Sequence, residues 1–177
     1  MTKSNQSFQS GFLLSLVLFV VIFIACNNPN GEVYKVKGDD SVGTNIKMYS
    51  HVWDEIINKR KLEMFSDSNF TKEVVMHASP KDAVGIDSAR AYYANYLTGF
   101  SDIRFTIIDV FGMGNKLVKH WNFKGTHTGL FFGIPATGKK VDIEGVTLVR
   151  MENGKIAEEQ DFFDNLEFMQ QLGLIPR

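Results

Sequence analysis

The stretch from Ile103 to Lys124 reads IRFTIIDVFGMGNKLVKHWNFK, and its hydrophobic period decides the expected fold. In its first part, apolar side chains recur at every second position, at Ile103, Phe105 and Ile107. This alternation is typical of a strand with one buried face. Gly112 to Asn115 then carries a turn signal, and residues 116–124 are expected to form a second strand. The segment therefore predicts a pair of adjacent strands.

Downstream of this pair, the sequence predicts two more strands and a closing helix. A glycine-rich loop, Gly125–Gly138, leads to a third expected strand, Val141–Arg150. Asn153-Gly154 is a strong hairpin signal, and a fourth strand is expected over Lys155–Phe163. The segment Asn165–Leu172 places its apolar residues on one face, which predicts a short C-terminal helix.

Upstream of residue 103 the hydrophobic period is that of helices. From Asn45, with Thr44 as a candidate N-cap, apolar residues follow the spacing of an amphipathic helix: Ile46, Tyr49, Val52, Trp53, Ile56 and Ile57. A short segment, Glu73–His77, follows a polar break. A second helix is expected after Gly85, with Asp87 or Ser88 as its cap. Helices followed by antiparallel strands predict an α+β domain, in which the helices cover one face of a curved sheet and leave a pocket.

The composition is that of a globular protein, with apolar residues concentrated at the start. The chain has 177 residues, 44% of them hydrophobic, and a net charge of −1, which argues against a nucleic-acid binder. Gly11–Ala25 carries no charge and follows Lys3. As a helix at about 1.5 Å per residue it spans roughly 22 Å, less than a bilayer core of about 30 Å. Residues 1–25 are therefore interpreted as a secretory signal peptide.

The lone cysteine of the chain follows this segment directly. Ile24-Ala25-Cys26 resembles the lipobox of bacterial lipoproteins, although Phe23 stands where that family usually has leucine. The resemblance implies that Cys26 is lipidated and anchors the protein to a membrane of the cell envelope. The alternative is an uncleaved N-terminal anchor helix. Residues 26–43 are expected to be a flexible tether, and residues 44–177 one compact domain.

Several short motifs in the second half of the chain carry a resemblance to a known family. Gly125–Gly129 (GTHTG) and Phe132–Lys139 (FGIPATGK) resemble a run shared by SnoaL-like polyketide cyclases, also called ester cyclases. The same family is matched in the same order by the strand ending at Arg150, the turn Asn153-Gly154, Lys155–Glu158, Asp164 and Gln171–Leu174. The resemblance covers roughly residues 44–177.

This resemblance implies a fold and an activity. The fold would be a cone-shaped α+β barrel of the NTF2-like superfamily, with N-terminal helices packed on a curved antiparallel sheet around an apolar pocket, and often a homodimer through the sheet. Named members close a polyketide ring by intramolecular aldol condensation, without a metal or a cofactor. The same superfamily also includes non-catalytic ligand binders, so the fold alone does not decide the function.

Two aspartates are candidate catalytic residues. An aldol closure needs one proton removed next to a carbonyl and one delivered to the carbonyl that is attacked, and a carboxyl group in an apolar pocket can do both. Asp161 lies inside a half-buried expected strand, where the resemblance places the acid–base aspartate of the family. Asp164 is the competitor, although the sequence from Asp164 to Glu167 also has the form of a helix-capping box.

The sequence departs from the family pattern at two positions next to these aspartates. Gln160 stands where the family has an aromatic residue. Thr147 stands fourteen residues before Asp161, where some cyclases carry a histidine. A threonine can form hydrogen bonds but does not titrate near neutral pH. Cyclase activity therefore stays open beside two alternatives, a lipid-anchored protein that binds a small hydrophobic ligand without catalysis and a structural module that dimerises through its sheet.

Five residues are expected to line the ligand pocket: His77, His120, Trp53, Asn122 and Thr147. His77 matches a histidine common in the family, and His120 shares a strand face with Asn122. His127 is expected to hold its loop by hydrogen bonds. No two histidines have metal-ligand spacing, and Gly112-Met113-Gly114 lacks the third glycine of a dinucleotide loop, so no metal and no cofactor is expected.

Overall fold

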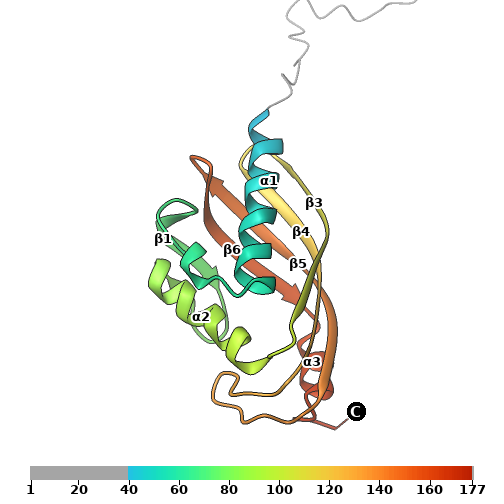
Figure 1. The fold of residues 1–177 in the computed structure, drawn as a ribbon. Coiled ribbons are helices and arrows are strands. Elements are labelled where there is room, and N and C mark those ends of the chain that lie inside the picture. Colours follow the sequence, from blue (N-terminus) through green and yellow to red (C-terminus); the bar gives the residue numbers. More distant parts are fainter. Residues whose placement is uncertain (1–39, 177) are drawn as a thin grey trace, which may run out of the picture. The chain divides into compact units, whose positions relative to one another are not determined.

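The computed structural model describes residues 40–176 (Figure 1). The expected signal peptide (residues 1–25), the expected lipidation site Cys26 and residues 27–39 of the expected tether lie outside the described residues. Within residues 40–176, no helix is long and apolar enough to cross a membrane.

One sheet of six strands forms the frame of the domain, in the order β2-β1-β6-β5-β4-β3. The four strands of the predicted meander, β3 to β6, pair antiparallel in sequence order. β1 pairs with β6 in parallel and with β2 antiparallel. Because β2 and β3 are the two edges, the sheet stays open instead of closing into a barrel. The strand bounds are β1 Phe70–His77, β2 Ala83–Val84, β3 Arg104–Met113, β4 Lys116–Thr126, β5 Lys140–Glu152 and β6 Lys155–Phe163.

The helices α1 (Asp40–Trp53) and α2 (Ile86–Gly99) precede the meander, and α3 (Asn165–Gln171) follows it. α1 continues as a π-helical segment, η1 (Asp54–Asn58), and a 3-10 turn, η2 (Leu62–Met64), comes next. In Figure 1, α1 and α2 lie over one face of the sheet, and α3 lies near the end of β6. The expected α+β fold is confirmed.

The structure places neither of the two expected caps at the start of its helix. α1 begins at Asp40, so Thr44 lies inside the helix and residues 40–43 of the expected tether are helical. The N-cap of α2 is Gly85, and no side chain makes the capping hydrogen bond. Gly85 has a φ of +85°, a conformation that costs glycine little because it has no Cβ. Backbone geometry therefore starts α2, in place of the predicted Asp87 or Ser88.

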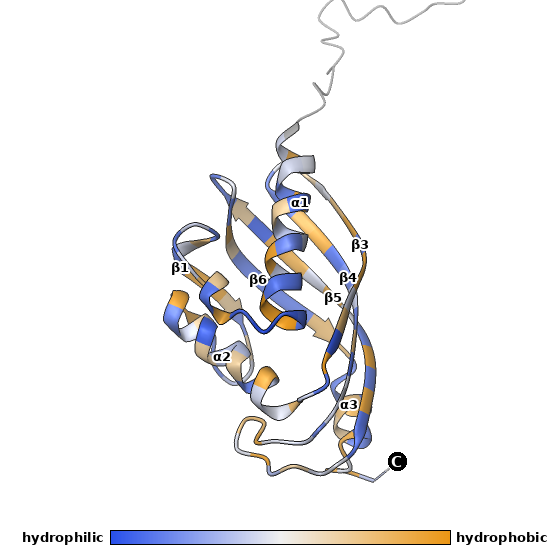
Figure 2. Ribbon diagram, in the orientation of Figure 1, coloured by the Kyte–Doolittle hydropathy of each residue, from blue (hydrophilic) through white to orange (hydrophobic). Residues whose placement is uncertain are grey.

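The side chains of the meander alternate between a buried inner face and an outer face, and Figure 2 shows this alternation as bands of hydrophobic and hydrophilic colour along the strands. On β4 the buried inner positions are Leu117, Lys119, Trp121 and Phe123. The three apolar ones, Leu117, Trp121 and Phe123, pack against the helices in two hydrophobic clusters. Burial of each large apolar side chain contributes roughly 1.5–3 kcal/mol, so this face holds the helices in place.

The loop between β4 and β5 is tied to the end of α2. The backbone amides of Thr128 and Gly129 both donate to the carbonyl oxygen of Gly99, at 2.9 and 3.0 Å. A Cβ atom at Gly129 would lie 2.1 Å from the carbonyl oxygen of Thr98, so only glycine fits there. His127 is fully buried, and its Nδ1 lies 3.1 Å from Thr137 Oγ1, as expected of a residue that holds the loop.

Candidate active site

An inner cavity of about 40 Å³ lies between the helices and the inner face of the sheet. A larger open cleft of about 680 Å³ adjoins it. The two spaces adjoin, because they share five lining residues, and the region that these residues border is called the passage: Tyr93, Tyr96, Asp161, Phe163 and Phe168. Cavity and cleft therefore make one candidate site with a narrow inner end and a wide mouth.

Asp161 stands at this passage on the inner face of β6. It pairs directly with Thr147 on β5, and the Thr147 hydroxyl donates a short hydrogen bond to Asp161 Oδ1. The Tyr93 hydroxyl donates to Asp161 Oδ2 at 3.3 Å. Trp121 Nε1 in turn donates to Thr147 Oγ1 at 2.9 Å. Both carboxylate oxygens thus have a hydroxyl partner that fixes their direction.

Two residues earlier on β6, Glu159 is an almost fully buried carboxyl group, with 2% of its surface exposed. Trp53 Nε1 donates to Glu159 Oε1 at 2.8 Å, whereas Oε2 has no hydrogen-bond partner. Burial and the nearby charge of Asp161 raise the pKa of Glu159 to about 7, against the opposing effect of Lys119. Glu159 therefore titrates near neutral pH.

Lys119, on the inner face of β4, is the buried cation of the site and is also 2% exposed. Its ammonium nitrogen lies 4.5 Å from the ring centre of Trp53, 5.1 Å from that of Phe105 and 5.3 Å from that of Tyr49. Cation–π contacts at these distances are favourable, and more so in a desolvated setting. The inner cavity is therefore lined by an ammonium group that three aromatic rings surround.

Glu159, Lys119 and the tyrosines of α2 were not predicted from the sequence as residues of the site. A signal was present, because Lys119 falls between Leu117 and Trp121 on the same face of an alternating strand. A charged residue at an inward position is rare unless it has a partner. Burial raises the pKa of Tyr93 and Tyr96 well above the ordinary value. Their hydroxyl groups thus stay protonated at neutral pH and can donate hydrogen bonds.

Three of the residues singled out from the sequence meet at the inner cavity, and a fourth, His77, lines the cleft. Trp53 and Asp161 line the inner cavity, and Thr147 holds Asp161 from the neighbouring strand. Trp53 also links the cavity to Glu159 through its indole N–H. Thr147 thereby makes a positioning contact at the position where, by the resemblance, some cyclases carry a histidine.

His120 and Asn122 lie on the outer face of β4, which corrects the expected pocket wall. His120 Nε2 lies 3.4 Å from Glu144 Oε2. Asn122 donates to Asp142 Oδ1 at 2.8 Å. Successive side chains of a strand point to opposite faces, and it is Lys119 and its inward neighbours that line the cavity.

Asp164 acts as the N-cap of α3. Its Oδ1 accepts a hydrogen bond from the backbone amide of Glu167 at 2.9 Å. It is absent from the described linings of both the inner cavity and the cleft. Of the two candidate aspartates, only Asp161 lies at the passage between these spaces.

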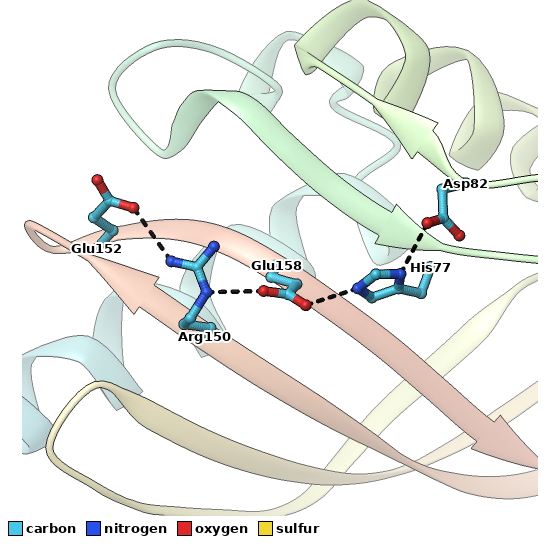
Figure 3. Close-up of polar contacts among 5 residues, drawn as sticks. All are labelled: His77, Asp82, Arg150, Glu152 and Glu158. Carbon is cyan, nitrogen blue, oxygen red and sulfur yellow. Dashed lines mark hydrogen bonds and ion pairs between the residues drawn. The ribbon is translucent and has the colours of Figure 1, made fainter.

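His77 belongs to a chain of charged groups across the outer face of the sheet (Figure 3). Its Nδ1 lies 3.0 Å from Asp82 Oδ2, and its Nε2 lies 2.7 Å from Glu158 Oε1. Arg150 Nε donates to the other oxygen of Glu158 at 2.8 Å, and its Nη1 reaches Glu152 at 3.2 Å. The hydrogen bond with Glu158 raises the pKa of His77. His77 borders the rim of the cleft but not the inner cavity.

Within residues 40–176, no group of three or more histidine, cysteine, aspartate or glutamate side chains is arranged to hold a metal ion.

Comparison with known proteins places this site in a family. The family model described as SnoaL-like polyketide cyclase matches residues 46–172. The chain belongs to the SnoaL-like polyketide cyclase family. Residues 46–172 contain the cavity, the cleft, Lys119 and Glu159. Family membership supports a cyclase-type function.

Individual relatives agree with this assignment. Aklanonic acid methyl ester cyclase DnrD of Streptomyces peucetius is 41% identical over 49 residues, which are 28% of this chain and 34% of the relative. Aklanonic acid methyl ester cyclase DauD of Streptomyces sp. (strain C5) is also 41% identical over 49 residues, 28% of this chain and 30% of the relative. The alignment thus spans only about a third of the length of these curated relatives.

Among solved structures, a putative SnoaL-like polyketide cyclase from Jannaschia sp. CCS1 has a TM-score of 0.69 at 24% identity, over 76% of this chain and 94% of that one. TsrD from Streptomyces laurentii has a TM-score of 0.65 at 23% identity, over 77% of this chain and 98% of that one. At these identities the likeness shows a common fold.

Proposed function

We propose that this SnoaL-like domain cyclises or isomerises a carbonyl-bearing, largely apolar small molecule, with Asp161 as the acid–base group. The observation that supports the proposal is the placement of Asp161. Among the described residues, it is the only carboxyl group that lines the inner cavity, and it also lines the cleft. Hydroxyl groups of Thr147 and Tyr93 orient both of its oxygens.

The chemistry needs only groups that the site contains. The Asp161 carboxylate removes a proton from the carbon next to a carbonyl, and the electrons of that C–H bond form an enolate. In a cyclisation, the enolate carbon then attacks a second carbonyl of the same molecule, and the carbon–oxygen π electrons move onto oxygen. Asp161 returns its proton to that oxygen, so the carboxylate is regenerated. A positioned acid–base group of this kind contributes typically 10²–10⁴-fold to the rate.

The shape of the site favours a flat apolar substrate. The cleft volume of about 680 Å³ falls within the range of about 300–1,000 Å³ of small-molecule sites. Aromatic rings of Tyr92, Tyr96 and Phe132 stand together at the mouth, with ring centres of Tyr92 and Phe132 5.1 Å apart. An aromatic polyketide ester such as aklanonic acid methyl ester, named in the relatives, is therefore the first probe to use.

The test compares full-length wild-type protein with Asp161→Asn and with Asp109→Asn, which removes an exposed carboxyl from β3 as a matched control. Each is incubated in D2O with aklanonic acid methyl ester, and mass spectrometry follows the cyclised product and deuterium next to the carbonyl. We expect Asp161→Asn to lower both rates by about 10²–10⁴-fold, with Asp109→Asn unchanged. An Asp161→Asn protein with the wild-type rate would refute the acid–base role.

The second candidate is a non-catalytic, lipid-anchored binder of a small hydrophobic ligand in the cell envelope. The observation that favours it is Thr147, which gives Asp161 a hydroxyl partner that does not titrate near neutral pH. A binder would retain the probe in native mass spectrometry with no cyclised product and no deuterium uptake in wild-type protein. Asp161→Asn would then change the affinity alone.

A further inference from the structure

We propose that Lys119 is the group that binds the carbonyl oxygen of the ligand and stabilises the negative charge that develops on it. The inner cavity would then be an oxyanion subsite, and the cleft would hold the body of the ligand. This inference rests on the proposed function, because it names the electrophilic partner of Asp161 in the same site.

The first argument is that Lys119 has unused hydrogen-bonding capacity. An ammonium group carries three N–H donors, and within residues 40–176 none of them donates a hydrogen bond to the protein. No carboxylate of the described domain lies within ion-pair distance of its nitrogen. Its contacts are the faces of Tyr49, Trp53 and Phe105. A cation that is 2% exposed, lines the cavity and makes no hydrogen bond with the described protein is therefore suited to an acceptor that arrives with the ligand.

The second argument is the size of the inner cavity. A water molecule needs about 10–15 Å³ of such space, so the cavity of about 40 Å³ admits an oxygen and the carbon that bears it, but no ring. The wide cleft shares five lining residues with it. A ligand that occupies both spaces therefore places its carbonyl end in the cavity and its apolar body in the cleft.

The third argument is the pairing of charges within the cavity. Asp161 and Lys119 both line it. When Asp161 takes the proton next to the carbonyl, the C–H electrons form a carbon–carbon double bond and the carbonyl π electrons move onto oxygen. An ammonium group already in place stabilises that oxygen in a low-dielectric site without reorganising. Glu159 does not line the inner cavity, so the oxygen does not meet a second carboxylate there.

The experiment uses 4-nitrophenol, whose phenolate is a stable, coloured mimic of an enolate. The apparent pKa of the protein-bound phenol is measured by absorbance with the full chain. We expect wild-type protein to lower this pKa by about one unit or more relative to unbound 4-nitrophenol, because an adjacent opposite charge favours the ionised form. Lys119→Met keeps the length of the side chain without its charge, and we expect it to abolish the shift.

Three further variants keep the result interpretable. Lys124→Met, on the outer face of the same strand, should leave the shift unchanged. Lys119→Met/Glu159→Gln removes the buried ammonium together with the nearby buried carboxyl group, so it tests the same subsite if Lys119→Met alone fails to fold. Asp161→Asn removes the neighbouring negative charge and should increase the phenolate fraction while it abolishes deuterium uptake.

The outcomes separate this inference from the proposed function. Loss of the phenolate shift in Lys119→Met together with a wild-type exchange rate in Asp161→Asn would support the oxyanion subsite and refute the acid–base role of Asp161. A wild-type protein that shifts the pKa of 4-nitrophenol no more than the Lys119→Met variant does, or that binds no phenolate, would overturn the inference.

Discussion

Glu159 shows how one buried side chain couples the site to pH. Its pKa of about 7 in the folded protein exceeds the value of about 4.3 of an unperturbed glutamate. Between these two pH values the folded state binds the proton more tightly than the unfolded state. Stability must therefore fall as pH rises through this window and level off above it. The burial that makes Glu159 chemically unusual also makes it destabilising when it is ionised.

We expect Glu159→Gln to flatten this dependence. A shift of this size corresponds to as much as about 3 kcal/mol, which the wild-type protein should lose between pH 5 and pH 8 relative to the variant. Urea unfolding at both pH values measures the difference, with Glu73→Gln, an exposed glutamate on β1, as the control. If wild-type protein and Glu159→Gln lost the same free energy of unfolding between pH 5 and pH 8, the buried titration would be refuted.

At the scale of elements, α3 depends on its N-cap residue. Asp164 accepts a hydrogen bond from the amide of Glu167, and α3 carries Phe168 into the passage between cavity and cleft. A capping side chain satisfies an amide that the helix cannot pair internally. The aspartate that competed for the catalytic role thus supports the wall of the site.

Asp164→Ala should lower the free energy of unfolding by about 1 kcal/mol, whereas Asp164→Asn should lower it much less, because asparagine also caps helices well. Urea unfolding measures both variants, and the deuterium-exchange assay tests their activity. Wild-type stability in Asp164→Ala would contradict the capping role. Loss of exchange in Asp164→Asn comparable to that in Asp161→Asn would restore Asp164 as a catalytic candidate.

At the scale of the whole molecule, one prediction concerns the N-terminal segment. We propose that Cys26 becomes the lipidated N-terminus, as its lipobox-like surroundings suggest. Intact mass spectrometry of protein expressed in bacteria should then give the chain from residue 26 onward with added lipid, and Cys26→Ser should lack the lipid. A mass that corresponds to all 177 residues would instead support the uncleaved anchor helix.

The expected homodimer also belongs to this scale and stays a prediction. The outer face of the sheet exposes the apolar side chains of Phe111, Leu148 and Phe162. Phe111 and Leu148 both pair with Val118 on β4, so they form one row across three strands. A partner subunit on this face would cover that row.

The fold class was accessible from sequence because it depends on local periodicity. The alternation that begins at Ile103 and the turn signals between strands required the antiparallel meander, and the observed β6 has the bounds that were predicted. The parallel pairing of β1 with β6 was not accessible, because it joins segments about eighty residues apart without a local signal. The start of α1 at Asp40 was missed because three of its first four residues are polar or glycine, as in the preceding linker. Val42 was the available signal, since it lies four residues before Ile46 and packs against the core.

The candidate site was only partly accessible, for a related physical reason. Sequence determined that Asp161 lies on a half-buried strand and that the chain resembles SnoaL-like cyclases. On β4, the apolar neighbours Leu117 and Trp121 already indicate that Lys119 points inward. Which groups surround its ammonium there depends on the packing of α1, which the hydrophobic period does not describe. Only the tertiary structure could bring Lys119, Glu159 and Asp161 together, because burial and charge proximity are properties of the assembled core.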